Sequence, residues 1–372
     1  MLPRLDEQDT GHLSGRLEQY MDSLTQAVLG ATVGYAVGGR HLGRKAALWG
    51  IGLGTLPDLD VLVRYVDPID SFVMHRSWSH SLILTGLAAF PLGLMISRLH
   101  KTARAAPMRM IYMAWLILFT HIMLDALTSY GTQIFWGLKE IIPTLPQAPV
   151  GVASISIIDP VYTLPLLFAT IWILVRGRVR PDGRATRAGS VTIVALLFST
   201  LYLGWGLIAQ NQVEQKLRAQ MAATATKIDD VYVTPTFGNS VLWYVMVREG
   251  DKVHYGLRSL LEDADKPIAL RTQERRSDLI ALLTNGSKAQ QVVAFSHGFY
   301  RLAETEGRIY IADMRMGYPP HFGFNFALAA RPDAAEDPVA LMPTEHVRGH
   351  LDSRLFGFLW QRIFDPAASM AN

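Results

Sequence analysis

Long apolar runs separated by short polar connections dominate the first 210 residues of the chain. Four runs reach or approach the roughly twenty residues that a helix needs to cross a bilayer. They lie at about residues 80–98, 109–127, 160–175 and 190–210. Two weaker runs, at about 23–39 and 46–57, are rich in glycine and alanine, which let helices pack closely inside a membrane bundle. The pattern predicts a mainly α, polytopic membrane helical bundle of about six segments.

The pattern changes after residue 210. Residues 211–230 are polar and helix-like, and residues 231–257 alternate in the manner of strands. Strand-like runs at 290–304 and 307–318 and a helical pattern at 277–286 follow. We therefore expect an N-terminal extension (1–21), a membrane-embedded helical domain (22–210) and a small soluble α+β domain (211–372).

Composition supports a membrane protein and limits the chemistry. Half of the residues are hydrophobic and 18% are charged, which is apolar for a soluble protein. The net charge of +3 is small, and the basic residues gather in short loops, so we expect no nucleic-acid partner. No protein partner is evident either. Because the chain has no cysteine, any metal must be held by nitrogen and oxygen atoms.

The basic residues also predict an orientation, since cytoplasmic loops carry an excess of lysine and arginine. Three connections hold most of them: Arg40, Arg44 and Lys45; Arg98, Lys101, Arg104 and Arg109; and Arg176, Arg178, Arg180, Arg184 and Arg187. The alternate connections, 58–79 and 128–159, hold only Arg64, Arg76 and Lys139. Six crossings would place these basic loops in the cytoplasm. We therefore expect a multi-pass protein of a bacterial cytoplasmic (inner) membrane with a periplasmic C-terminal domain.

Several polar residues recur where this topology predicts the non-cytoplasmic ends of the segments. They are Asp22, Thr25, Gln26, Asp58, Asp60, His75, His80, His121 and Asp125. Residues far apart in the sequence would thus share one layer of the bundle. An ionisable side chain inside a span, such as His121, costs on the order of several kcal/mol and usually marks function.

The spacing of these residues suits a metal site. His121 and Asp125 are four apart and project from one helix face. His75 and His80 are five apart, so we expect a loop ligand and a ligand in the first turn of a helix that Ser79 caps. Asp58 and Asp60, in "PDLD", offer two carboxylates. Such a set suits a divalent metal, first zinc and otherwise manganese or iron(II), and leaves room for a water.

Plainer interpretations stand beside this one. A single histidine near a membrane interface often only makes hydrogen bonds, and Asp58 alone could be a helix cap. Arg76 is as well explained by a solvated charge as by substrate contact, and Trp78 by an interfacial anchor. Three hydroxyls near the ligands, Thr120, Thr128 and Tyr130, suit hydrogen bonds between helices or to the ligands. In the C-terminal domain, His297, Arg315 and His321 are expected to be solvated rather than catalytic.

Four motifs in order resemble the YdjM-like family of inner-membrane metal-dependent hydrolases: "MDSLTQAVLGA", "LPDLD", "HRSWSHSL" and "HIMLDALTSYGTQIFW". They cover about residues 21–137. The resemblance implies a membrane-embedded helical domain with a divalent metal site at Asp58, Asp60, His75, His80, His121 and Asp125. Many members have histidine where this chain has Gln26. The family is also distantly similar to zinc-dependent phospholipase C and P1 nuclease, which implies phosphoester chemistry.

The leading hypothesis is a metal-dependent hydrolase that acts on a phosphoester or lipid-linked substrate among the membrane lipids. His75, His80, His121 and one or more of the three aspartates would bind the metal, and Asp58 or Asp60 would activate a water. Arg76 would neutralise an anionic oxygen. Two alternatives remain: a metal-stabilised scaffold or regulatory protein without catalysis, favoured by closed four-ligand coordination, and a metal or proton transporter.

Overall fold

A computed structural model describes most of the chain. It covers residues 7–138, 141–146, 148–156, 158–179, 186–283, 288–330, 340–347 and 353–368, with the backbone alone for residues 7–22. Two compact units make up these residues. The membrane unit comprises Arg16–Val63 and His75–Gly206. The C-terminal unit comprises the described parts of Met1–Gly15, Arg64–Met74 and Leu207–Asn372.

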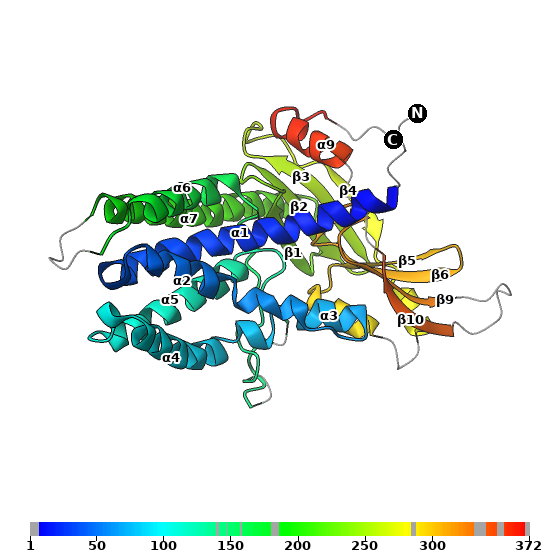
Figure 1. Cartoon of the computed structure of the whole chain (residues 1–372). Helices are drawn as coiled ribbons and strands as arrows, with labels where there is room; N and C mark the ends of the chain where they lie inside the picture. Colours follow the sequence, from blue (N-terminus) through cyan, green and yellow to red (C-terminus); the bar gives the residue numbers. More distant parts are fainter. Residues whose placement is uncertain are drawn as a thin grey trace, which may run out of the picture. The chain divides into compact units, whose positions relative to one another are not determined.

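Helices build the membrane unit (Figure 1). They are α1 (Glu7–Leu42), α2 (Arg44–Thr55), α4 (Leu82–Leu99), α5 (Pro107–Ala126), α6 (Pro160–Arg176) and α7 (Arg187–Ala223), which continues into the C-terminal unit. Two short 3-10 helices, η1 (Pro57–Leu62) and η2 (Trp78–His80), precede α3 and α4 in the sequence, and η3 (Lys101–Ala103) joins α4 to α5. Fully buried Ile96, Met110, Ile117 and Leu166 are part of its apolar core.

The prediction of six membrane crossings is not supported. Among the described residues, three helices are long and apolar enough to cross a bilayer: α4, α5 and α7. α6 is a shorter apolar helix of 17 residues. α2 has only 12 residues, about 18 Å of helix, which falls short of a hydrocarbon core of roughly 30 Å. Its apolar residues Ala46, Ala47 and Leu53 are buried against other helices.

Glycines bring α1 and α2 into backbone contact. A methyl group added at Gly50 would lie 2.0 Å from the Gly30 carbonyl oxygen, and one added at Gly34 would lie 2.6 Å from the Ala46 oxygen. Only glycine permits so close an approach, as in other membrane helix pairs. The contact fixes α2 beside α1, and the end of α2 leads directly into η1.

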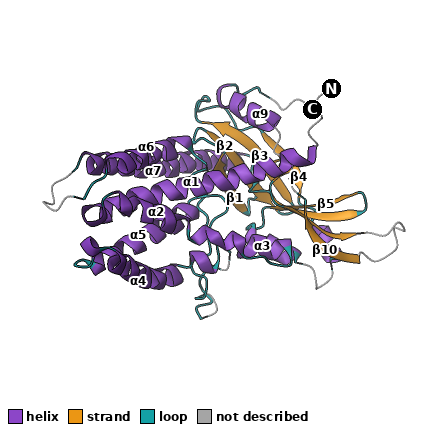
Figure 2. Ribbon diagram, viewed as in Figure 1, coloured by secondary structure: helices purple, strands orange, loops and turns teal. Residues whose placement is uncertain are grey.

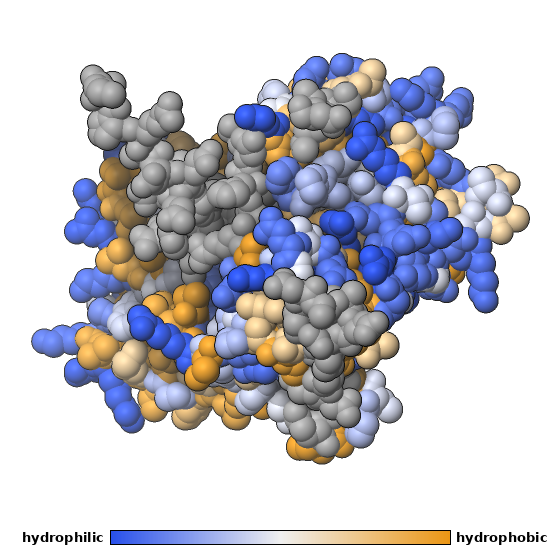
Figure 3. Space-filling view, turned by 90° about the vertical axis from the view of Figure 1, so that its right-hand side faces the viewer, coloured by the Kyte–Doolittle hydropathy of each residue, from blue (hydrophilic) through white to orange (hydrophobic). Residues whose placement is uncertain are grey.

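The C-terminal unit is built on antiparallel sheets (Figure 2). One has the order β1-β2-β3-β4, with strands Asp230–Pro235, Leu242–Glu249, Lys252–Ser259 and Leu270–Glu274. The second has the order β10-β9-β6-β5, with strands Ala340–His346, Asn325–Ala330, Arg308–Asp313 and Tyr300–Thr305. A two-stranded ribbon pairs β7 (Gly317–Tyr318) with β8 (His321–Phe322). Figure 3 shows hydrophilic residues over much of one face, chiefly on its right-hand side, and hydrophobic residues gathered toward its left-hand and lower edges.

Short helices complete this unit: α3 (Pro68–Met74), η4 (Ser277–Leu282), α8 (Ala289–Phe295) and α9 (Ser353–Phe364). The sheet-containing C-terminal domain was predicted, but the strand expected over 290–304 begins only at Tyr300, because residues 289–295 form α8. Buried Val292 and Phe295 show that packing overrides the strand preference of the two adjacent valines.

Candidate metal centre

Four side chains of the membrane unit converge on one point. They are Asp58 of η1, His80 of η2, and His121 and Asp125 of α5, and one ligand atom from each lies within 4.8 Å of the others. The two Nε2 atoms of the histidines are 3.0 Å apart. Asp125 Oδ2 lies 2.9 Å and 3.4 Å from them, and Asp58 Oδ1 lies 3.4 Å and 3.5 Å from them.

These separations match the edges of a metal coordination tetrahedron. Ligands about 2.0–2.1 Å from a zinc ion sit roughly 3.3–3.4 Å from one another. Five of the six separations, those that involve a histidine Nε2 atom, range from 2.9 to 3.5 Å. The buried Asp–His–His–Asp cluster could therefore hold a divalent metal ion.

Unsatisfied oxygens provide a second, independent test of this fit. Among the described residues, both carboxylate oxygens of Asp58, and Oδ2 of Asp125, are buried without a hydrogen-bond partner. Burying such a group without compensation is costly, so buried polar atoms nearly always have a partner. The orphaned oxygens that lie against the histidine Nε2 atoms fit coordination of a cation.

Hydrogen bonds behind the histidines fix their orientation. His121 Nδ1 lies 2.7 Å from the Gly54 carbonyl oxygen, to which it can only donate, so Nε2 is the free lone pair. His80 Nδ1 lies 2.8 Å from Ser79 Oγ, and that hydroxyl donates to Asp60 Oδ2 at 2.5 Å. Such outer contacts hold the rings of metal-binding histidines in place.

Asp125 is held in the same way through its other oxygen. Gln26 Nε2 donates to Oδ1 at 2.8 Å, and an Arg76 guanidinium nitrogen lies 3.3 Å from it. The buried Arg76 also donates to Thr128 Oγ1 at 3.2 Å and stacks over the Tyr130 ring. Oδ2 is thereby directed toward the histidines.

Asp60 and His75 form a pair beside the cluster. Asp60 Oδ1 lies 2.7 Å from His75 Nδ1, and its Oδ2 accepts from the Arg76 backbone N–H at 3.0 Å and from Ser79. His75 is the more accessible partner, with 30% of its side chain exposed. The structure therefore places these two predicted ligands next to the four converging groups, as a hydrogen-bonded pair of their own.

The carboxylates outside the spans favour their ionised forms. Burial raises the pKa of Asp58, but the charge of His121 and the contacts with His121 and His80 outweigh it, and the pKa falls well below its usual range. Burial likewise raises the pKa of Asp60, and the contacts with His75 and Ser79 lower it below its ordinary value. A divalent cation requires anionic oxygens and neutral histidines, and it would supply the positive charge in place of a protonated His121.

Several other residues singled out in the sequence lie outside the group of four converging ligands. Ser81, not Ser79, caps α4 by accepting from the Leu84 N–H. Trp78 is 40% exposed. Thr120 donates within its own helix, to the carbonyl oxygens of Leu116 and Ile117. The Asp22 side chain lies outside the described residues, and the role of Ser79 as a link between Asp60 and His80 had no signal in its spacing.

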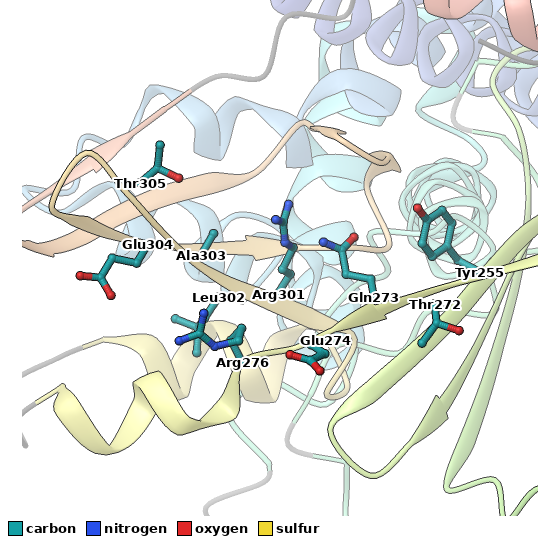
Figure 4. Close-up of a pocket in the computed structure, with 10 residues that line it drawn as sticks. All are labelled: Tyr255, Thr272, Gln273, Glu274, Arg276, Arg301, Leu302, Ala303, Glu304 and Thr305. Atoms are coloured by element: carbon teal, nitrogen blue, oxygen red, sulfur yellow. The ribbon is translucent and has the colours of Figure 1, made fainter. Parts of the chain in front are cut away.

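In the C-terminal unit, Arg315 was expected to be solvated but is buried. Its guanidinium forms an ion pair of 2.7 Å with the fully buried Asp313. His297 is exposed at the end of α8, and His321 lies in β8. Figure 4 shows an open hollow in this unit, lined by Tyr255, residues 272–274, Arg276 and residues 301–305. Its arginines and glutamates mix both signs, so it has no single charge preference.

Comparison with protein families matches residues 21–213, just over half of the chain, to the YdjM inner membrane protein family. The chain belongs to this family, as its four motifs predicted. The match covers all four converging ligands. No curated protein and no solved structure matches the chain. Apolar helices, family membership and the cluster together define a membrane protein with a potential metal site.

Proposed function

We propose that the protein is a membrane-bound, metal-dependent hydrolase, with zinc as the first choice of metal and manganese or iron(II) as the others. The observation that carries the proposal is the set of four converging ligand atoms: the five separations that involve a histidine Nε2 atom suit a tetrahedral site, and the two aspartate oxygens have no hydrogen-bond partner among the described residues. When bound, a divalent cation would supply a Lewis acid that lowers the pKa of a water toward neutrality.

The donor types favour a catalytic site. Structural zinc sites are mostly rich in cysteine, whereas catalytic sites use histidine and carboxylate and admit a water. Asp58 is also the least buried of the four ligands, because 13% of its side chain is exposed against 1% or less for the other three, although both of its carboxylate oxygens are buried. Water and substrate would therefore approach from the Asp58 side.

Residues of this chain would move the protons. Asp58 Oδ2, buried without a partner, would accept a proton from the attacking water. The His75–Asp60 pair lies beside the cluster, with the His75 ring 6.3 Å from the His80 ring, and would deliver a proton to the leaving oxygen. Arg76 would act by holding Asp125 in place.

The proposed substrate is a phosphoester of a lipid or lipid-linked molecule at the periplasmic membrane face. Large apolar side chains are exposed next to the ligands in sequence: Leu59 at 50%, Leu62 at 72% and Trp78 at 40%. Exposed apolar and aromatic residues of this kind suit contact with acyl chains and headgroups.

A metal clamp without catalysis is the second candidate. Four protein ligands from η1, η2 and α5 would fill a tetrahedral site, which would leave no position for a water if the geometry does not expand. In that case, removing the metal would lower the thermal stability of the protein and no hydrolysis would occur.

Elemental mass spectrometry of the detergent-purified protein tests the shared site. We expect about one equivalent of metal in the wild type and loss of it in His80→Ala and His121→Ala, because each removes one of four ligands. His100→Ala is the matched control, since His100 contacts Trp49 in the same unit and lies outside the cluster. Metal retained in both ligand variants would contradict the proposal.

Turnover distinguishes the two candidates. A chromogenic phosphodiester and phospholipid in mixed micelles would be incubated with the metal-loaded protein and with Asp58→Asn. Hydrolysis by the wild type alone supports the enzyme. Stoichiometric metal, a large fall in melting temperature on chelation and no hydrolysis of either substrate would support the clamp.

A further inference from the structure

The chain makes an excursion between two parts of the candidate metal centre. It leaves the membrane unit after Val63 and returns at His75, and the residues between belong to the C-terminal unit. α3 ends at Met74, so no residue separates this helix from His75. The Asp60 carboxylate joins the two ends of this segment, because Asp60 precedes it and contacts His75 Nδ1 and the Arg76 N–H directly after it.

Aromatic packing anchors α3 within the C-terminal unit. Phe72 is 5% exposed, and its ring centroid lies 4.3 Å from that of Phe295 in α8, 4.6 Å from that of Phe324 and 5.4 Å from that of Phe326 in β9. Ile69 is fully buried. Aromatic pairs of this kind stabilise the fold by more than the burial of their apolar area alone would.

Charged groups fix the other face of the helix. Lys288, at the start of α8, pairs with the Asp70 carboxylate and lies 3.4 Å from Asp67 Oδ2. The same Asp67 oxygen accepts from Thr344 Oγ1 of β10 at 3.2 Å. Asp67 Oδ1 accepts from the Ile69 N–H at 2.8 Å. α3 is thus held by both apolar and ionic contacts.

Two of the four ligands depend on the residues that follow α3. Asp60, which is bound to His75 and to the Arg76 N–H, holds Ser79 and through it His80. The Arg76 guanidinium holds Asp125. Arg76 also has a φ of 59°, in the left-handed region that a non-glycine residue occupies only when its surroundings impose it.

We propose that the docking of α3 in the C-terminal unit positions His80 and Asp125, so that this unit controls the metal affinity of the centre. Phe72 and Lys288 are positioning residues that act through His75, Arg76 and Asp60. The proposal rests on the metal site of the proposed function and is independent of whether hydrolysis occurs.

The test uses full-length protein in detergent with two readouts. Hydrogen exchange of the metal-free protein reports on residues 68–74 and 75–81, and chelator competition with Zn²⁺ reports on affinity. Lys288→Glu sets a third carboxylate against Asp67 and Asp70. We expect it to speed exchange in both segments and to weaken Zn²⁺ binding by about 10-fold, the lower end for loss of outer contacts. Adding Asp70→Lys restores the pair and should reverse both effects.

Two further variants complete the design. Arg276→Glu makes the same charge change in the same unit, at the exposed pair with Asp278, and should alter neither readout. Phe72→Ala removes the aromatic anchor and is a second way to release α3. Faster exchange of 68–74 with unchanged exchange of 75–81 and unchanged affinity would overturn the proposal. So would unchanged exchange of 68–74 in both variants. If Zn²⁺ does not bind at all, the metal site fails, and the exchange data still decide the coupling.

Discussion

The Ser79 hydroxyl links a carboxylate to a metal-binding histidine, since it donates to Asp60 at 2.5 Å and lies 2.8 Å from His80 Nδ1. We expect Ser79→Ala to lower Zn²⁺ affinity by about 10–100-fold, because the His80 ring loses the contact that orients it. Chelator competition measures the change. Ser97→Ala is the control, since that buried hydroxyl donates to the Leu94 carbonyl of its own helix, away from the cluster. Equal affinities in the two variants would contradict the assigned role.

Spacing alone predicted part of this arrangement. Side chains four residues apart on a helix project from the same face, so the sequence alone predicted that His121 and Asp125 would lie together. Asp60 and His75 are of the same residue types as the four converging ligands. No local sequence pattern tells a metal ligand from a residue that only supports a ligand by a hydrogen bond. That distinction depends on where each carboxylate oxygen points, and tertiary contacts such as the Arg76 N–H to Asp60 bond decide it.

The contact between α1 and α2 can be tested with a matched pair of variants, because α2 carries both a tightly packed glycine, Gly50, and an open one, Gly52. Gly50→Ala would place a methyl group 2.0 Å from the Gly30 oxygen, whereas a methyl group added at Gly52 would meet no neighbouring element of the described chain within 4 Å. We expect Gly50→Ala to destabilise the protein by about 1–3 kcal/mol through overpacking. Gly52→Ala should be neutral or stabilise it by up to about 1 kcal/mol, since alanine is the better helix former.

The measurement is thermal unfolding in detergent, together with metal content. α2 ends next to Gly54, whose carbonyl accepts from His121, and Asp58 follows in η1. If Gly50→Ala displaces α2, the protein should therefore also lose metal. The Gly52→Ala variant should retain it. Equal melting temperatures for the two variants would show that the α1–α2 contact does not limit stability.

The features that sequence patterns failed to predict, the burial of α2 and the docking of α3, depend on contacts with residues far away in the sequence. Within residues 46–57, Ala46, Ala47 and Leu53 are buried against other helices whereas Leu48 and Leu56 are exposed, and an apolar pattern does not distinguish a protein neighbour from lipid. The docking of α3 had no signal either, since Asp70 and Lys288 are 218 residues apart. Helices α4 to α7 could be predicted well, because long apolar runs require no partner to be recognised.

The orientation of the whole protein depends on whether α6 crosses the membrane. The arginine-rich connections before α5 and after α6 lie on the same side only if both helices cross. α6 has 17 residues, the short limit for a span. We therefore expect α6 to cross and the C-terminal unit to face the periplasm, with the connection between α4 and α5 in the cytoplasm.

The absence of native cysteine makes the labelling test direct. Asp265→Cys in the C-terminal unit and Lys101→Cys between α4 and α5 both replace exposed residues. In spheroplasts, a membrane-impermeant maleimide should label only Asp265→Cys, and both variants should react after detergent lysis. α5, α6 and α7 lie between the two positions, so three crossings put them on opposite sides. Labelling of both in spheroplasts, or of neither, would mean that α6 does not cross, and labelling of Lys101→Cys alone would reverse the orientation.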